Sequence, residues 1–99
     1  MMDIRKELTD EGLCMAVSGR LDTTTAPELD AALKEALPGV KDLLLDFSAL
    51  DYISSAGLRV LLATQKIMSK QGSMTLTGVN EGVMEVFEIT GFSGILTIE

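Results

Sequence analysis

Two neighbouring hydroxyl groups precede an expected helix near the middle of the chain. Ser54 and Ser55 stand in the run Leu50-Asp51-Tyr52-Ile53-Ser54-Ser55-Ala56-Gly57-Leu58. The first N–H groups of a helix have no partners inside it, and the helix dipole is positive there. A phosphate added to either serine would therefore be well accommodated. A plainer interpretation is that Ser55 only caps the helix, and the spacing alone leaves both open.

The same serines do not fit a hydrolase. A nucleophile elbow has the pattern Gly-x-Ser-x-Gly, and residues 53–57 supply only the second glycine. The chain has no His, so no imidazole can accept a serine proton. Lys66 and Lys70, the conceivable alternative bases, stand more than two helical turns beyond Ser55. We therefore expect no enzymatic activity and no catalytic residue.

The composition excludes further classes of chemistry. With 15 acidic and 8 basic residues the net charge is −7, and the basic residues form no run, which argues against direct binding of nucleic acid. The absence of His and the single cysteine, Cys14, exclude a disulfide within the chain and the usual zinc ligands. We expect no metal and no cofactor. Cys14 stands in an apolar run and is expected to be a buried, unreactive thiol.

Length and apolar patterning indicate one soluble domain. The 99 residues correspond to a single domain over 1–99 with enough chain to bury one hydrophobic core. No apolar stretch approaches the ~18 residues that a membrane span needs. The first residues, Met-Met-Asp-Ile-Arg-Lys-Glu, carry charges where a signal peptide would be apolar. We expect a cytoplasmic protein without membrane insertion.

Periodicity predicts an α/β fold in the order β-β-α-β-α-β-α-β, a mixed sheet with an N-terminal hairpin and helices packed on it. The hairpin turn is expected at 10–12, and residues 48–55 lack a regular period and are expected to form a connecting loop. The expected strands cover 3–8, 13–19, 42–47, 74–77 and 95–98, and the expected helices cover 26–37, 56–70 and 81–90.

Capping residues are expected at the helix ends. Thr25 with Glu28 fits a capping box, and Pro27 suits a first helical turn. Asn80 is expected to begin the last helix, and Gly72 to end the middle one. Pro38-Gly39 and Gly91 are expected to end the other two helices. The apolar faces expected to point inward are Leu29, Ala32, Leu33, Ala36 and Leu37, then Leu58, Leu61, Leu62 and Gln65, then Val83, Val86 and Phe87.

Two segments together carry a family resemblance. The run Asp51-Tyr52-Ile53-Ser54-Ser55-Ala56-Gly57-Leu58, followed by Arg59-Val60-Leu61-Leu62, resembles the signature of STAS domains, the bacterial anti-sigma factor antagonists. Upstream, Gly19-Arg20-Leu21-Asp22 with Thr25-Ala26 and Leu29 resembles the second motif of that family. The likeness covers essentially the whole chain, and two motifs at the right separation are more specific than either alone.

The resemblance implies a switch in partner exchange. In such families the unmodified antagonist binds an anti-sigma factor, often also a serine kinase, and so frees the sigma factor. Phosphorylation of a serine at the start of the second helix blocks binding, and a phosphatase restores it. Against the family pattern Asp-Ser-Ser/Thr-Gly, Ser54 takes the place of the aspartate, Ser55 that of the phosphorylated serine, and Ala56 that of the second hydroxyl. Ser54 is thus a departure from the family.

The resemblance also implies a partner-binding surface around the serines, on a chain that is a monomer when free. Asp22 either adds to the negative field beside Ser55 or is a solvated loop residue, and Thr23 to Thr25 form a capping turn rather than a phosphate cradle. The residues implied in partner binding are Asp22, Thr23, Ser54, Ser55, Ala56, Gly57 and Arg59.

An alternative function stays open at this point. The chain is also compatible with a STAS-type interaction module of a transporter or a stress-signalling complex, in which Ser55 is never phosphorylated.

Overall fold

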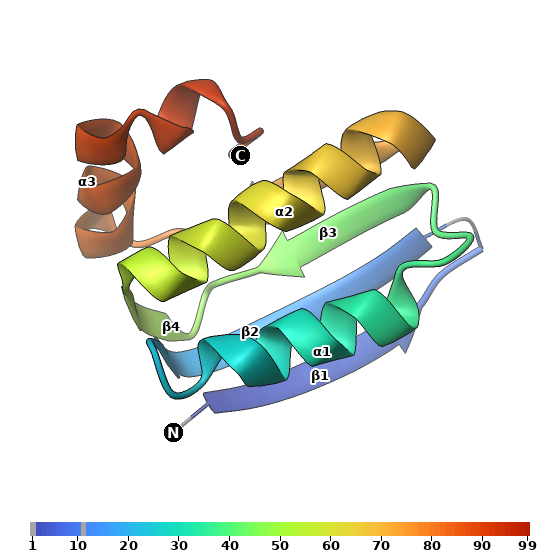
Figure 1. Cartoon of the computed structure of the whole chain (residues 1–99), viewed down its shortest axis with the longest axis horizontal. Helices are drawn as coiled ribbons and strands as arrows, with labels where there is room; N and C mark the ends of the chain where they lie inside the picture. The colour runs from blue at the N-terminus through green and yellow to red at the C-terminus, as the bar shows by residue number, and fades with distance from the viewer. Residues whose placement is uncertain (1, 11) are drawn as a thin grey trace.

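One five-stranded sheet carries two helices side by side on one face, and a third helix lies at one end of the molecule (Figure 1). This computed structural model describes residues 2–10 and 12–99. The elements in chain order are β1 (Met2–Leu8), β2 (Gly12–Leu21), α1 (Ala26–Ala36), β3 (Asp42–Asp46), β4 (Leu50–Ile53), α2 (Ser55–Gln71), β5 (Ser73–Thr77), α3 (Glu81–Thr90) and a 3₁₀ turn at Phe92–Gly94.

The second strand organises the sheet. It pairs antiparallel with β1, so that Met2 faces Gly19 and Leu8 faces Leu13. The first half of β2 pairs in parallel with β3, and its last residues pair in parallel with β4; β5 then pairs in parallel with β3. The α/β class, the mixed sheet and the N-terminal hairpin are confirmed. The expected turn at 10–12 includes Glu11, which lies outside the described residues.

The core fills the space between one face of the sheet and the helices. Alternate residues of β2 and β3 point into it, because successive side chains of a strand point to opposite faces. On the helix side, the apolar spacing of α1 buries Leu29 and Leu33, as expected, and α2 buries Leu58 and Leu61. Leu62 and Gln65 are only half-buried, and Thr64 and Met68 take the inward positions instead. Core residues from the strands include Leu13, Met15, Val17, Leu43, Leu45, Met74 and Leu76.

Cys14 points to the opposite face of the sheet, so its expected place in the core was wrong. Its side chain is half-buried because it lies one residue out of step with Leu13 and Met15. Burial raises the pKa of the Cys14 thiol, and the carboxylates of Asp46 and Glu7 raise it further. The thiol form is therefore favoured, and this form is a poor nucleophile.

The expected loop over 48–55 was wrong, because residues 50–53 form β4. Only the two ends of this strand, Leu50 and Ile53, are buried, while Asp51 and Tyr52 between them are exposed. That spacing lacks the alternation of buried and exposed residues that identifies a strand, so periodicity did not predict one here. The pairing with β2 also shifts register between Gly19 and Arg20, as at a β-bulge.

The expected last strand over 95–98 is reduced to one bridge. Residues Phe92–Gly94 form a 3₁₀ turn, and only Ile98 pairs with β5, opposite Leu76. Two backbone hydrogen bonds fix this end: Leu76 N–H donates to the Thr97 carbonyl, and Glu99 N–H donates to the Leu76 carbonyl, both at 2.9 Å. The observed order therefore differs from the expected one in two places.

The helix ends confirm three of the expected caps and correct one. Gly72 and Gly91 end α2 and α3; Gly91 has a φ of 84°, a left-handed conformation that glycine adopts without steric cost. Asn80 caps α3 through a hydrogen bond from Val83 N–H. Thr25 occupies the N-cap position of α1 but its side chain caps no helical N–H, so the expected capping box is wrong.

Asn80 also links α3 to β4, and this link can be tested. Its side chain accepts from Val83 N–H and donates to the Leu50 carbonyl, both at 2.8 Å. Asn80→Ala loses both hydrogen bonds and should lower the free energy of unfolding by about 1–3 kcal/mol. Asn80→Asp keeps the cap but not the donor, and should lose only about 0.5–1.5 kcal/mol. Urea titrations measure both values. An Asn80→Asp variant as stable as the wild type would show that the link to Leu50 contributes nothing.

Candidate functional site

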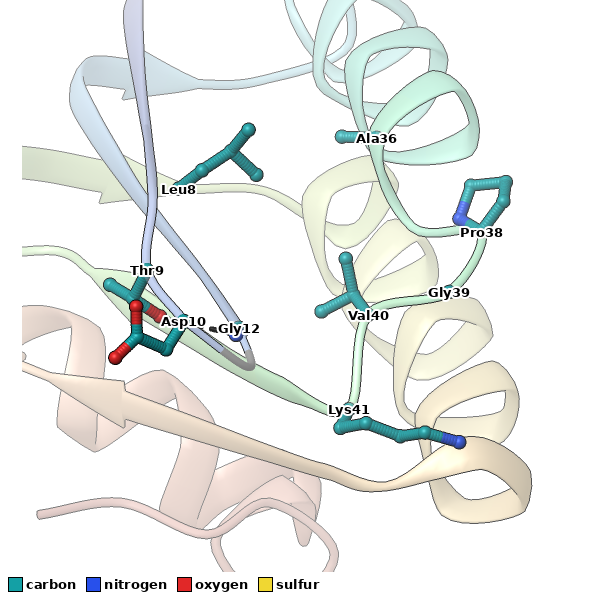
Figure 2. Close-up of a pocket in the computed structure, with 9 residues that line it drawn as sticks. All are labelled: Leu8, Thr9, Asp10, Gly12, Ala36, Pro38, Gly39, Val40 and Lys41. Atoms are coloured by element: carbon teal, nitrogen blue, oxygen red, sulfur yellow. Dashed lines mark hydrogen bonds between the residues drawn. The ribbon is translucent and has the colours of Figure 1, made fainter.

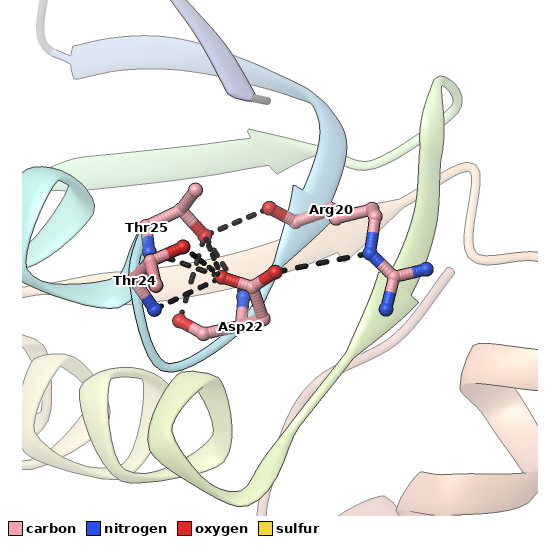
Figure 3. A network of polar contacts seen from close by, with 4 residues as sticks. All are labelled: Arg20, Asp22, Thr24 and Thr25. Carbon is pink, nitrogen blue, oxygen red and sulfur yellow. Dashed lines mark hydrogen bonds and ion pairs between the residues drawn. The ribbon is translucent and has the colours of Figure 1, made fainter.

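The two motifs of the sequence meet where β2 and β4 end. Leu21 of β2 pairs with Ile53 of β4, and Ser54 N–H donates to the Leu21 carbonyl at 2.9 Å. Leu58 N–H donates to the Ser54 carbonyl at 3.0 Å, which closes the first turn of α2. The chain thus leaves the sheet and enters α2 directly beside the loop that follows β2 (Figure 3).

Ser54, not Ser55, is the N-cap residue of α2. Its backbone is extended, with φ −104° and ψ 177°, yet its side chain accepts no hydrogen bond from the helix. The Ser54 Oγ is instead buried without a hydrogen-bond partner among the described residues. The first turn of α2 contains no acidic residue. Its N–H groups and the positive end of its dipole are therefore offset by no carboxylate of that turn.

Ser55 is the first residue of α2, and its side chain is exposed. Because Leu21 pairs with Ile53, Thr23 and residues 54–57, which follow these two strand ends, lie at the same end of the sheet. Ser55 combines a hydroxyl accessible to a second protein with a backbone position that favours an attached anion.

Asp22 closes the loop between β2 and α1, so the interpretation of it as a merely solvated residue was wrong. Its Oδ1 accepts from Thr24 N–H at 3.0 Å, from the Thr24 hydroxyl at 2.8 Å and from Thr25 N–H at 3.1 Å (Figure 3). The Thr25 hydroxyl donates to the Arg20 carbonyl and accepts from Asp22 N–H, both at 2.8 Å. The hydrogen bond from the Thr24 side chain is the main cause that lowers the pKa of Asp22, and the hydrogen bonds from Thr25 add to it.

Arg20 joins this loop to β4. Its Nε lies 3.8 Å from Oδ2 of Asp22, and its Cζ lies 4.2 Å from the centre of the Tyr52 ring. A guanidinium over an aromatic face contributes about 0.5–1 kcal/mol at an exposed site. Arg20 and Tyr52 were not expected to meet, because their contact depends on the unexpected pairing of β2 with β4.

Gly57 lets α2 lie close to the sheet. It is buried, and a Cβ at this position would lie 2.7 Å from Cγ of Leu21 and 2.8 Å from Cγ1 of Ile53. The close approach is thus to side chains of β2 and β4, and it fixes where the first turn of α2 sits. Arg59 follows one half-turn later and is exposed.

One hollow of the molecule lies away from the two serines. A hollow of about 480 Å³ lies at the opposite end of the sheet, between the β1–β2 turn and the end of α1, with Asp10 and Lys41 among its lining residues (Figure 2). Within 2–10 and 12–99, no three Asp, Glu or Cys side chains gather as a metal site would require. In the same part of the chain, no helix combines the length and apolarity needed to cross a membrane.

The fold and this junction define an α/β domain whose serine-bearing helix starts beside the loop after β2. A family model described as "Mlab, STAS domain" matches residues 4–97. The chain belongs to the STAS domain family.

Proteins similar to this chain carry related names. A Bordetella bronchiseptica protein provisionally named anti-sigma factor antagonist BtrV is 36% identical over 99 residues, which cover 98% of this chain and 85% of that protein. The anti-sigma-B factor antagonist of Bacillus subtilis is 30% identical over 98 residues, which cover 98% of this chain and 88% of that protein.

Solved structures show the same fold. An anti-sigma factor antagonist from Mycobacterium paratuberculosis has a TM-score of 0.91 at 24% identity and covers 99% of this chain and 85% of its own. The anti-sigma factor antagonist SpoIIAA matches in its unphosphorylated form with a TM-score of 0.83 at 20% identity, covering 98% of this chain and 88% of its own. The phosphorylated form of SpoIIAA from Bacillus matches with a TM-score of 0.75 at 19% identity, covering 98% and 91%.

The hydrogen bonds to Asp22 predict a measurable pH dependence. Because they lower its pKa in the folded protein, ionised Asp22 stabilises the fold at every pH above its unfolded pKa. That contribution is lost as the pH falls from the unfolded value, about 3.9, through the lower folded value. Asp22→Asn should therefore flatten the acid limb of the stability–pH curve, measured by urea unfolding between about pH 2 and 6.

Thr24→Ala is the matched variant for Asp22. It removes the largest cause of the lowered pKa and leaves the carboxylate in place. The Asp22 carboxyl resonance should then titrate at a higher pH in a carbon-13 NMR series. An unchanged Asp22 titration in Thr24→Ala would contradict the assigned cause.

Two helical glycines should respond oppositely to alanine. Gly57→Ala places a methyl group against Leu21 and Ile53; overpacking costs about 1–3 kcal/mol, which exceeds the gain of up to ~1 kcal/mol in helix propensity. Gly82→Ala in α3 meets nothing closer than Asn80 Oδ1 at 3.5 Å, and should stabilise by up to ~1 kcal/mol. Thermal melts compare the two. A Gly57→Ala protein at least as stable as the wild type would show that contact with the sheet does not require glycine there.

Proposed function

We propose that this chain is an anti-sigma factor antagonist, acting as one domain over residues 1–99. It binds an anti-sigma factor while Ser55 is unmodified and is switched off when Ser55 is phosphorylated. The observation that carries the proposal is the exposed Ser55 hydroxyl on the first residue of α2. The names of the relatives above support the choice of partner.

The unmodified surface offers a partner a fixed shape. The Asp22 hydrogen bonds hold the loop after β2, and Gly57 holds the first turn of α2 against β2 and β4. A rigid surface loses little conformational entropy on binding. Asp22 and Gly57 are therefore positioning residues, whereas the exposed Thr23, Ser55 and Arg59 are the residues that contact the partner.

A phosphate on Ser55 changes this surface without unfolding it. It adds about −1.5 to −2 charges and three strong acceptor oxygens. The N–H groups and dipole of α2 stabilise that charge within the chain. A partner surface fitted to a neutral hydroxyl would instead have to desolvate a dianion. The modified chain is thus stable alone but a poor ligand.

The partners follow from this switch. The anti-sigma factor is of the serine kinase type, and a phosphatase removes the phosphate. The chain itself catalyses nothing, binds no nucleic acid directly, acts in the cytoplasm and is a monomer when free. The alternative, an interaction module whose Ser55 is never modified, predicts that a cognate kinase with ATP adds no phosphate.

Substitutions at Ser55 separate a switch from a simple helix residue. Immobilised wild-type protein first captures its anti-sigma factor, which mass spectrometry identifies, and calorimetry then gives the affinities. Ser55→Ala should bind that factor as the wild type does but become insensitive to kinase and ATP. Ser55→Glu should fold well, because an acidic side chain at a helix N-terminus gains roughly 0.3–1 kcal/mol, yet bind at least tenfold more weakly, a loss of about 1.4 kcal/mol.

Ser54→Ala is the control, since it changes the neighbouring hydroxyl and should leave kinase sensitivity intact. Fragment mapping by mass spectrometry should place the phosphate on Ser55 alone. Modification of Ser54 instead would show that the modified residue lies one position before the one proposed. A Ser55→Glu protein and an enzymatically phosphorylated wild type that both bind tightly would eliminate the switch.

A further inference from the structure

The charge of α2 is opposite to that of the rest of the chain. Its 17 residues include Arg59, Lys66 and Lys70 and no Asp or Glu, in a chain whose net charge is −7. All three basic side chains are exposed. Such a local reversal of sign creates a positive strip that attracts a negatively charged partner.

The three cations lie on the same face of α2 as Ser55. They follow it by 4, 11 and 15 residues, so at about 3.6 residues per turn all four side chains fall within about 60° around the helix axis. This face, which we call the basic stripe (Arg59, Lys66 and Lys70), points away from the core, because the inward side is formed by Leu61, Thr64 and Met68. The stripe extends about 22 Å along the helix from Ser55.

Within residues 2–10 and 12–99, the basic stripe makes no ion pair. Within the described ranges, the ion pairs are Arg20 with Asp22 and Lys34 with Asp30; no carboxylate there lies within 4.0 Å of a stripe nitrogen. Ile67 lies along the border of the stripe and is 39% exposed. Three unpaired cations beside an exposed isoleucine are of little value to the fold, but they suit a protein interface that has an apolar centre and a charged rim.

We propose that the basic stripe continues the docking surface from Ser55 along α2 and takes an acidic helix of the anti-sigma factor. This inference rests on the proposed function above. Arg59 and Lys66 lie about 10 Å apart along α2, which is two helical turns, and Lys66 and Lys70 lie about 6 Å apart, which is about one turn. Carboxylates with the same two spacings on the partner helix would match them. Nucleic acid is disfavoured, because the remainder of the chain would repel its phosphates.

The basic stripe also explains why a phosphate on Ser55 would weaken binding of the partner. A phosphate on Ser55 precedes Arg59 by four residues, and an acidic group placed N-terminal to a cation at this spacing pairs well on a helix. The phosphate takes Arg59 away from the partner and adds negative charge to the end of the surface that receives an acidic helix. Phosphorylation therefore opposes docking through electrostatics as well as through desolvation.

Charge reversal on the stripe tests this inference. The probe is the anti-sigma factor identified with the wild-type protein, titrated in a calorimeter at about 50 and 300 mM salt. Lys66→Glu and Lys70→Glu should each weaken binding about tenfold at low salt, and should make the affinity depend less steeply on salt. Lys6→Glu, the same charge change on exposed β1, should stay within about twofold. Circular dichroism melts establish that every variant folds.

The outcomes separate the two proposals. If the wild type binds the anti-sigma factor and both reversals on α2 bind as tightly as Lys6→Glu, the stripe is not part of the interface, although the proposed function stands. If the wild type binds no anti-sigma factor, both proposals fail. Cosedimentation with phosphatidylglycerol vesicles, lost in Lys66→Glu while affinity for the anti-sigma factor is unchanged, would assign the stripe to lipid and overturn the inference.

Discussion

The hydrogen bond from Ser54 N–H to the Leu21 carbonyl is the contact on which the functional surface depends. It joins the ends of β2 and β4, and it fixes the residue at which α2 begins. The loop held by Asp22 follows directly from Leu21, and the exposed hydroxyl of Ser55 follows directly from Ser54. Two motifs separated by about thirty residues of chain therefore become neighbours through the pairing of β2 with β4, which this hydrogen bond extends to the start of α2. Gly57 then holds the helix against Leu21 and Ile53, so the relative position of the two segments has little freedom.

This contact requires a second strand that is longer than the other strands of the sheet. β2 spans 10 residues and pairs along its length with β1, and its opposite edge is divided between β3 and β4. A shorter strand would pair with β3 alone, and the chain between β3 and α2 would then be a free loop. The strand β4 therefore has a structural role although it contains only 4 residues. It supports the start of α2, and Asn80 joins it to α3 as well.

The elements around β4 were also the ones that the sequence did not predict. Helices and strands with a complete apolar period, such as α1 with Leu29 and Leu33, were predictable because one buried face needs that spacing. The strand β4 was not predictable, because its two buried residues, Leu50 and Ile53, lie three positions apart. Its pairing with β2 also shifts register between Gly19 and Arg20. The contact of Arg20 with Tyr52 depends on that missed pairing, so local sequence held no signal for it. The hydrogen bonds of Asp22 are local, because its partners Thr24 and Thr25 lie two and three residues further along the chain. The place of Ser55 at the start of the helix was predictable. The N-cap, however, is Ser54 and not Ser55, because sequence patterns locate a helix boundary only to within one or two residues.

Ser54, which stands where the resembling family pattern has an aspartate, would change the electrostatics of the proposed switch. An aspartate at the N-cap of α2 would accept hydrogen bonds from the helical N–H groups and hold a negative charge there before any modification. Ser54 carries no charge, and its hydroxyl does not cap the helix. A phosphate on Ser55 would therefore meet N–H groups that the side chain of the N-cap has not engaged. The change in charge on phosphorylation is the same beside a serine or an aspartate, but the stabilisation of the phosphate by the helix would be larger in this chain than beside an aspartate. A kinase that recognises the aspartate would lose that contact, so recognition has to come from other residues, and the basic stripe on the same face of α2 is positioned to supply it.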